Sequence, residues 1–103
     1  MNMDVKKFLD FVDSLKPDMS EWSARGGVDV YAELPDCYLT SLVAKATECG
    51  LRPTRAKECQ TIVGRYGEGI QLTTNLWGNI GMKDTAILTE NGLVTVVRTA
   101  GIR

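Results

Sequence analysis

The clearest pattern in the chain is a helical repeat of apolar residues between residues 34 and 51. Apolar side chains recur every three or four residues, at positions 35, 38, 39, 42, 43, 46 and 49, which places them on one face of a helix. Pro35 or Asp36 is expected to start the helix, because Pro suits the first turn and the Asp carboxylate can accept from free backbone N–H groups. Gly50 is expected to end it in a left-handed conformation, followed by an apolar contact from Leu51.

Residues 3–15 predict another helix. Its apolar face consists of Val5, Phe8, Leu9, Val12 and Leu15, and Phe11 widens it. Asn2 or Asp4 is expected to cap the start of this helix, and Pro17 is expected to end it by restricting the backbone of Lys16.

Residues 18–27 combine a helix-start signal with a break. Asp18 and Glu21 match the D-x-x-E form of a capping box, which predicts a short helix or a single turn through Trp22. The ring of Trp22 is then expected to pack against the first helix. Gly26-Gly27 is expected to break the segment.

Residues 28–34 alternate strictly between apolar and polar side chains, which predicts a half-buried strand that leads directly into the helix after it. One face carries Val28, Val30, Ala32 and Leu34, and the other carries Asp29, Tyr31 and Glu33. We expect the carboxylates of Asp29 and Glu33 to face solvent.

Beyond residue 50 the chain is rich in glycine and β-branched residues, which favours strands and turns. Residues 59–65 and 70–74 predict two strands of a hairpin, with a turn at residues 66–69. Residues 75–84 are expected to form a loop. Residues 85–89 and 93–99 predict a second hairpin around Asn91-Gly92, a pair that favours a two-residue turn. A three-residue Glu90-Asn91-Gly92 turn is the alternative, and the sequence leaves the register open.

Together these elements predict one α+β domain over residues 1–103, in two layers. We expect an antiparallel sheet of about five strands, made of one N-terminal strand and two C-terminal hairpins, with both main helices packed on one face. The other face would carry many Thr residues and Tyr31, and would be wet or meet a partner.

Composition adds limits but no activity. The net charge of −1 favours no particular partner, although residues 1–48 carry −4 and residues 49–103 carry +3. No apolar run approaches the ~20 residues that span a bilayer, and acidic residues interrupt the N-terminal segment where a signal peptide would be apolar. We therefore expect a cytoplasmic protein with no membrane partner.

Catalytic and metal-binding patterns are weak. The chain has three Cys and no His, so a thiol nucleophile at Cys37 would lack the usual base, and the usual zinc spacings are absent. A bridge between Cys49 and Cys59 is conceivable but not predicted. The glycines at 64, 67 and 69 lie between strands, which does not match a phosphate-binding loop. We expect no catalytic residue, no metal and no cofactor.

Two segments are candidates for binding. The loop at 75–84 mixes large apolar side chains with Gly and Asn, and Trp and Met are enriched at the buried centres of protein interfaces; the candidate protein-binding residues are Leu76, Trp77, Asn79, Ile80 and Met82. A basic cluster with a neighbouring aromatic ring is the candidate for phosphate and base contacts; it consists of Arg52, Arg55, Lys57, Arg65 and Tyr66.

The function that these patterns favour is a small non-enzymatic protein-interaction module. Its size and style are those of a phage or mobile-element accessory protein that binds and inhibits a host protein, an argument from association only. Self-association through an uncovered sheet face or edge is a further expectation, and the protein partner stays unidentified. The alternatives are a nucleic-acid-binding module that uses the basic cluster and, ranked last, a small thiol-dependent enzyme.

Overall fold

Two helices and a six-stranded sheet make up the part of the chain that the structure describes. The computed structural model describes the backbone of residues 4–24, 27–60, 66–73 and 85–102, and the side chains of residues 4–23, 27–55, 68–73 and 85–99. The elements in chain order are α1 (Val5–Ser14), β1 (Asp18–Ala24), β2 (Gly27–Pro35), the 3-10 helix η1 (Asp36–Tyr38), α2 (Leu39–Glu48), β3 (Thr54–Gln60), β4 (Tyr66–Gln71), β5 (Thr85–Glu90) and β6 (Leu93–Ile102). None of the described helices is both long and apolar enough to cross a bilayer.

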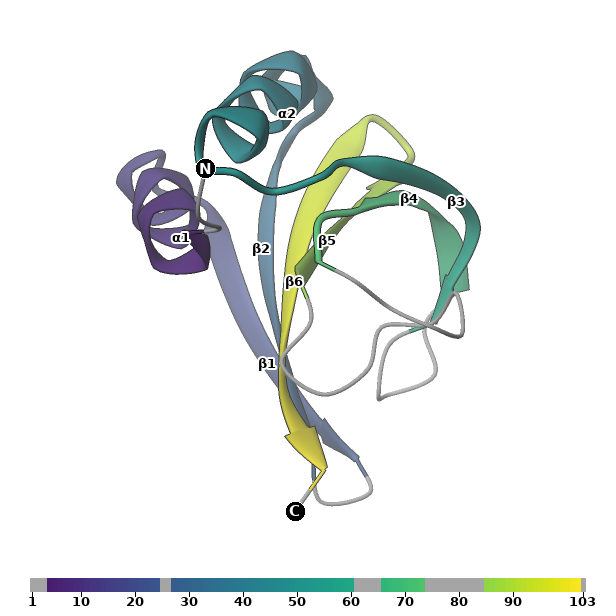
Figure 1. The fold of residues 1–103 in the computed structure, drawn as a ribbon. Helices are drawn as coiled ribbons and strands as arrows, with labels where there is room; N and C mark the ends of the chain where they lie inside the picture. Colours follow the sequence, from purple (N-terminus) through teal and green to yellow (C-terminus); the bar gives the residue numbers. More distant parts are fainter. Residues whose placement is uncertain (1–3, 25–26, 61–65, 74–84, 103) are drawn as a thin grey trace.

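All neighbouring strands are antiparallel, in the order β1-β2-β6-β5-β4-β3 (Figure 1). The α+β class and the antiparallel sheet are thus confirmed, with one strand more than the five expected. The additional strand is β1, where the capping-box pattern predicted a short helix or turn. That prediction was wrong because this segment pairs with β2 over its whole length, from Asp18 opposite Glu33 to Ala24 opposite Gly27.

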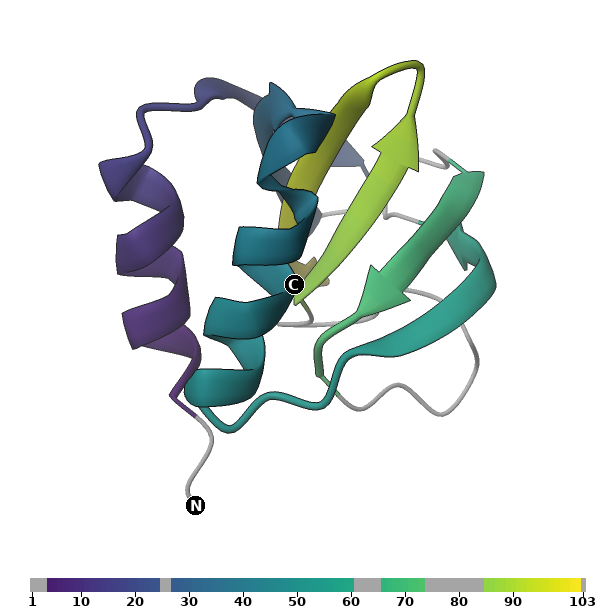
Figure 2. The same ribbon diagram turned by 90° about the horizontal axis from the view of Figure 1, so that it is seen from above.

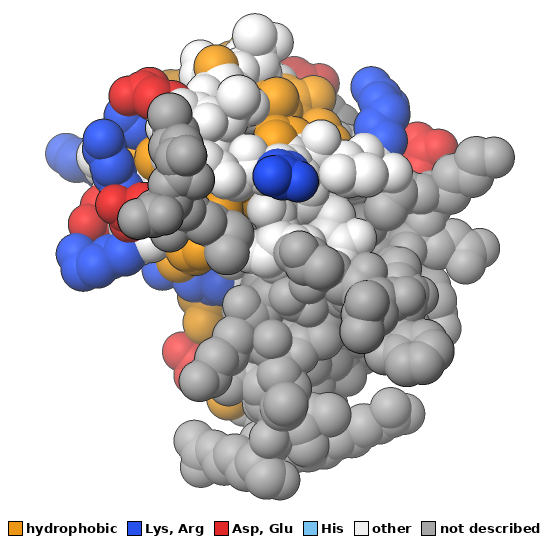
Figure 3. Space-filling model, in the orientation of Figure 1, with side chains coloured by type: hydrophobic (Ala, Val, Ile, Leu, Met, Phe, Trp, Pro, Cys, Tyr) orange, Lys and Arg blue, Asp and Glu red, His pale blue; other side chains and the backbone are white. Residues whose placement is uncertain are grey.

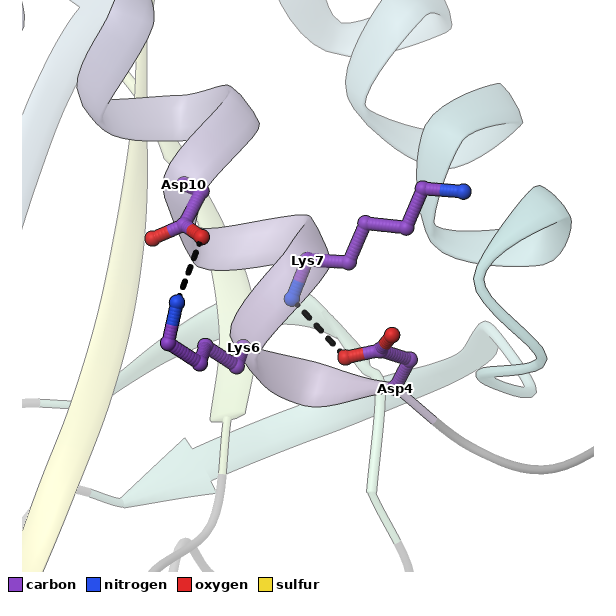
Figure 4. Close-up of polar contacts among 4 residues, drawn as sticks. All are labelled: Asp4, Lys6, Lys7 and Asp10. Atoms are coloured by element: carbon purple, nitrogen blue, oxygen red, sulfur yellow. Dashed lines mark hydrogen bonds and ion pairs between the residues drawn. The ribbon is translucent and has the colours of Figure 1, made fainter.

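The helix α1 forms where its pattern predicts. Of the two candidate caps, Asp4 is the one used: its carboxylate accepts from the backbone N–H of Lys7 at 3.0 Å. On the exposed side, Lys6 donates to Asp10 at 2.9 Å (Figure 4), and this hydrogen bond and the charge of Asp10 raise the pKa of Lys6. The helix ends before Pro17 as expected, with Lys16 at a left-handed φ of 54°.

The second main helix starts with a 3-10 turn and ends with a left-handed glycine. The 3-10 turn begins at Asp36 with Pro35 as its N-cap residue, where the start was expected, but no side chain caps either η1 or α2, so the predicted capping by the Asp36 carboxylate is wrong. At the other end Gly50 has φ 82°, and its N–H donates to Thr47 while the N–H of Leu51 donates to Ala46. This pair of bonds is the Schellman motif, so the predicted cap is confirmed.

Both helices lie side by side on one face of the sheet, as predicted (Figure 2). They run antiparallel, and the N–H of Asp4 before α1 donates to the carbonyl of Cys49 after α2 at 2.8 Å. The buried cluster beneath them contains Phe8, Val12, Leu42, Ala46 and Cys49 from the helix layer and Ala32, Leu34, Ile87, Val94 and Val96 from the sheet. Helix and sheet therefore share one apolar core.

The opposite face of the central strands is buried too, which the sequence did not predict. Tyr31, Ala86, Leu88 and Val97 form a second buried cluster on that face. Asp29 is completely buried among them, so the expectation that it faces solvent was wrong, whereas Glu33 is half-buried. The expectation of a wet face fails at these central strands because β2, β5 and β6 alternate between two buried sides.

The C-terminal hairpin has the two-residue turn. Glu90 pairs with Leu93, and Asn91 and Gly92 have φ of 50° and 77°, the left-handed values that a type I′ turn requires at both positions. The three-residue alternative is excluded.

The first C-terminal hairpin exists but is shifted. The predicted turn at 66–69 was wrong because Tyr66 to Gly69 belong to β4, where Gly69 pairs with Ala56 and Gly67 with Cys59. The strand β3 begins at Thr54, earlier than predicted, and its register shifts between Ala56 and Cys59. Glycines opposite such a bulge fit a strand as well as a turn. Residues 61–65 and the predicted loop at 75–84 lie outside the described residues.

Candidate functional site

The strand β1 is a regular edge of the sheet. Among the described residues it pairs with β2 alone, in an unbroken register from Asp18 to Ala24. The two-residue turn makes Glu90 and Leu93 a hydrogen-bonded pair, and bonded residues alternate from strand to strand. Carried across β6 and β2, this alternation turns the backbone groups of Met19, Glu21 and Ser23 away from β2. These groups are available to a further strand.

Large apolar side chains are exposed on this edge. Trp22 is 58% exposed and Met19 is 50% exposed, the two highest values among the large hydrophobic residues that the structure describes. Because side chains alternate along a strand, the pair projects on opposite faces of β1. Met19 shares the face of Ala32, beneath the helices, and Trp22 shares the face of Asp29. The prediction that Trp22 packs on α1 was therefore wrong.

The same edge is acidic. Asp18 and Glu21 are exposed on β1, Glu33 is half-buried on β2, and neither strand contains Lys or Arg. In Figure 3, hydrophobic and acidic side chains follow the border of the molecule where Figure 1 draws β1, while Lys and Asp side chains alternate over α1. Apolar and acidic groups thus combine along the backbone groups that point outward.

The other edge of the sheet, β3, differs from β1 in its register and in its charge. The strand β3 has a register shift between Ala56 and Cys59, and its sequence carries Arg55 and Lys57. A bulge is one of the features by which proteins protect an edge from pairing with another strand, and β1, which also carries charged side chains, has no register shift. Of the two edges, β1 is the one that a regular partner strand fits.

A groove of about 660 Å³ lies between the start of the second helix and the β5–β6 turn. Leu39, Ile70 and Val94 line it with apolar surface, and Asp36, Arg55, Glu68 and Glu90 line it with charge. Leu93, which is 42% exposed, also lines it. An apolar floor with a mostly acidic rim suits a ligand that has an apolar body and a cationic group, but carboxylates around such a floor do not by themselves identify a ligand.

The predicted nucleic-acid site is described only in part. Arg52 and Arg55 are exposed, whereas the side chains of Lys57, Arg65 and Tyr66 lie outside the described residues. Arg55 lines the groove together with Asp36 and Glu68. Carboxylates this close to a guanidinium oppose the approach of a phosphate.

The predicted protein-binding loop is untested. Leu76, Trp77, Asn79, Ile80 and Met82 all lie outside the described residues, so their role stays a prediction.

The cysteines separate into an exposed and a buried thiol. Cys37 in η1 is a free, exposed thiol, and Cys49 is a free, buried thiol in the core. The side chain of Cys59 is not described. Among the described side chains, no group of three or more Cys, Asp or Glu is placed to hold a metal ion.

The buried polar pair on β2 is a structural feature that the sequence analysis missed. The hydroxyl of Tyr31 donates to Asp29 Oδ2 at 3.2 Å, and both side chains are buried. Both side chains lie on the face away from the helices, and Val30 between them lies on the opposite face. A buried carboxylate needs such donors, because the charged form loses its hydration.

The exposed residues of β1 were also missed as a site. Met19 and Trp22 are three residues apart, a spacing that suggests a helix face and hides a strand in which they point to opposite sides. The available signal was Gly26-Gly27 directly before an alternating strand, which is compatible with a hairpin partner upstream.

Comparisons of the chain with family models, with curated proteins and with solved structures gave no significant match. The arguments about function therefore rest on the fold and the geometry of the site.

Proposed function

We propose that this chain is a non-enzymatic protein-interaction module that binds its partner along the β1 edge. One observation carries the proposal: Trp22 and Met19 are exposed on a regular edge strand whose outward backbone groups have no strand beside them among the described residues. Trp and Met are typical of the buried centres of interfaces. An extended segment that joins a free edge gains main-chain hydrogen bonds along its length.

The test is affinity capture from a lysate of the source cells, in the presence of nuclease, with wild type and the Trp22→Ala variant. Removing an exposed side chain is expected to change the free energy of unfolding by less than about 0.5 kcal/mol, so the variant stays folded. We expect a protein partner that wild type retains and Trp22→Ala loses. A partner held equally by both proteins would contradict binding at β1.

Leu93→Ala is the matched control, because it truncates another exposed apolar side chain and lies at the groove on the far side of the second helix. It is expected to retain the partner. Loss of the partner with Leu93→Ala alone would move the interface to the groove.

The nucleic-acid alternative depends on Arg52 and Arg55, and its signature is salt. Binding driven by phosphate contacts weakens steeply as salt is added, whereas strand pairing around Trp22 is expected to depend on salt much less. Inhibition of a host protein, an origin in a phage and self-association remain predictions from the sequence.

A further inference from the structure

We infer that the segment that pairs with β1 belongs to a different protein and places apolar residues opposite Met19 and Trp22 and basic residues opposite Asp18 and Glu21. This inference rests on the proposed function and adds the chemistry of the partner. Three features of the edge carry it: the outward backbone groups, the positions of the two exposed apolar side chains, and the charge.

The backbone requires an extended partner. The groups that point outward belong to Met19, Glu21 and Ser23, which are spaced two residues apart along a strand without bulges. A partner that satisfies all of them must stay extended over at least five residues. The strand β1 runs from Asp18 to Ala24, so the shared length is at most 7 residues.

The exposed side chains require apolar residues on both faces of the partner. On the helix side the residue opposite Met19 would cover a side chain that is 50% exposed, and on the other side the residue opposite Trp22 would cover one that is 58% exposed. Cross-strand pairs of this kind stabilise a sheet when apolar or aromatic groups meet.

The acidic side chains of β1 favour basic residues on the partner, opposite Glu21 and Asp18. Glu21 lies on the same face as Met19, and Asp18 lies on the same face as Trp22; both carboxylates are exposed, and no Lys or Arg occurs in β1 or β2. Opposite charges across neighbouring strands are favourable. The aliphatic stems of Lys and Arg can also cover Met19, and their charged ends can lie over the ring of Trp22.

A second copy of this chain fits the edge poorly. A twofold dimer would pair β1 antiparallel with itself. Centred on Glu21, the two Glu21 side chains oppose each other; centred on Ser20, Asp18 opposes Trp22 and Glu21 opposes Met19. Centred on Trp22, the strands overlap only from residue 20 to residue 24, which leaves Met19 outside. Each register therefore opposes like charges, sets acidic side chains against the apolar ones, or leaves an apolar side chain outside the shared length.

The experiment is a selection of binders from a displayed library of random twelve-residue peptides, followed by affinity measurements with the selected peptides. We expect the binders to contain two pairs of adjacent residues, each an apolar residue beside Lys or Arg, with the pairs repeating at an interval of three residues. Glu21→Lys is expected to weaken them at least tenfold at low salt, and Trp22→Ala is expected to weaken them as much. Glu48→Lys is the matched control, because it makes the same change in charge at an exposed site on α2, away from both β1 and the groove, and it is expected to leave affinity within twofold.

Amide hydrogen exchange on the complex locates the peptide. Slower exchange at Met19, Glu21 and Ser23 supports pairing with β1. Neutral or acidic peptides that slow these amides would overturn the basic partner and leave the β1 edge intact as a binding site. Peptides that ignore both Trp22→Ala and Glu21→Lys, or a selection without binders, would overturn the β1 edge itself. A concentration-dependent dimer that slows the same amides without peptide would show a second copy as the occupant.

Discussion

The carboxylate of Asp29 is fully buried in the sheet, where it is cut off from water. The hydroxyl of Tyr31 donates to it at 3.2 Å from two residues along the same strand. An ionised group taken out of water is tolerated only when donors replace its hydration. The hydrogen bond between Tyr31 and Asp29 is therefore expected to contribute to the stability of the folded sheet.

Replacement of Tyr31 by Phe tests that link. The variant keeps the ring in its buried cluster and removes the donor to Asp29, so we expect the free energy of unfolding to fall by about 1–3 kcal/mol. Urea denaturation at neutral pH measures it. Tyr38→Phe is the control, since Tyr38 is half-buried against the core and should change stability by less than about 0.5 kcal/mol. If Tyr31→Phe lowers the free energy of unfolding no more than the small change expected for Tyr38→Phe, the hydroxyl of Tyr31 adds nothing to stability.

At Gly50 the backbone conformation favours glycine over any residue that has a Cβ atom. At φ 82° it closes the Schellman motif after α2, and a Cβ is disfavoured there. We expect Gly50→Ala to lower the free energy of unfolding by about 1 kcal/mol in thermal or urea denaturation. Lys16→Gly is the reciprocal variant, because Lys16 already has a left-handed φ of 54°, a conformation that suits Gly better than Lys. It should not lose stability; a loss would mean that left-handed φ is not the limiting factor at these helix ends.

At the scale of elements, the sequence predicts those that carry their own local signal. The apolar period, Asp4 and Pro17 locate α1; the period and Gly50 locate α2; Asn91-Gly92 locates the C-terminal turn. In each case the residues that define the element are neighbours in the chain. Local chemistry and tertiary packing agree there, so a single sequence is sufficient.

Elements whose state depends on distant partners were not predictable in the same way. The strand β1 has no alternating pattern because neither of its faces is buried as a unit, and only its pairing with β2 makes it a strand. Likewise Gly67 and Gly69 suggest a turn, yet their partners Cys59 and Ala56 hold them in β4. Pairing across the sheet overrides a local preference of about 1 kcal/mol or less.

The candidate site was missed for a related reason. Exposure of Trp22 follows from its place on an edge strand, and an aromatic residue in a short chain is more often part of the core. The burial of Asp29 depends on a second buried face that composition does not announce. A site built from an edge and its neighbour becomes visible only when the order of the strands is known.

The contact between α2 and the sheet is the main element-scale interaction, and Leu42 is its fully buried centre. Leu42→Ala is expected to lower the free energy of unfolding by about 2–5 kcal/mol, because truncation leaves a cavity between helix and sheet. Urea denaturation measures the loss. The neighbouring Ser41→Ala is the control, as Ser41 is exposed on the same helix and should change stability by less than about 0.5 kcal/mol. A loss below 1 kcal/mol for Leu42→Ala would mean that α2 is not held by this core.

At the scale of the whole molecule, the sheet is graded from a buried centre to an open edge. Val94 to Val97 of β6 are buried on both faces, while β1 exposes Met19 and Trp22. Charge is graded as well, because the charged residues of β1 and β2 are all acidic, whereas the opposite edge strand β3 contains Arg55 and Lys57 beside Glu58. If the proposed function holds, stability and recognition belong to different parts of one sheet, with the fold held by the buried centre and the partner bound at the acidic edge.

Hydrogen exchange of the isolated protein tests this division. Amides of Val94 to Val97 in β6 are expected to exchange only through global unfolding, with an opening free energy equal to that from urea denaturation, because β2 and β5 flank this stretch and both of its faces are buried. Amides of Met19, Glu21 and Ser23, which point away from β2, are expected to exchange at rates close to those of an unstructured peptide. Their neighbours Ser20 and Trp22 should fall between these limits, since they bond to β2 alone. If the outward amides are instead as slow as those of β6 at every protein concentration, something within the chain covers the edge, and β1 is not the surface by which this protein binds.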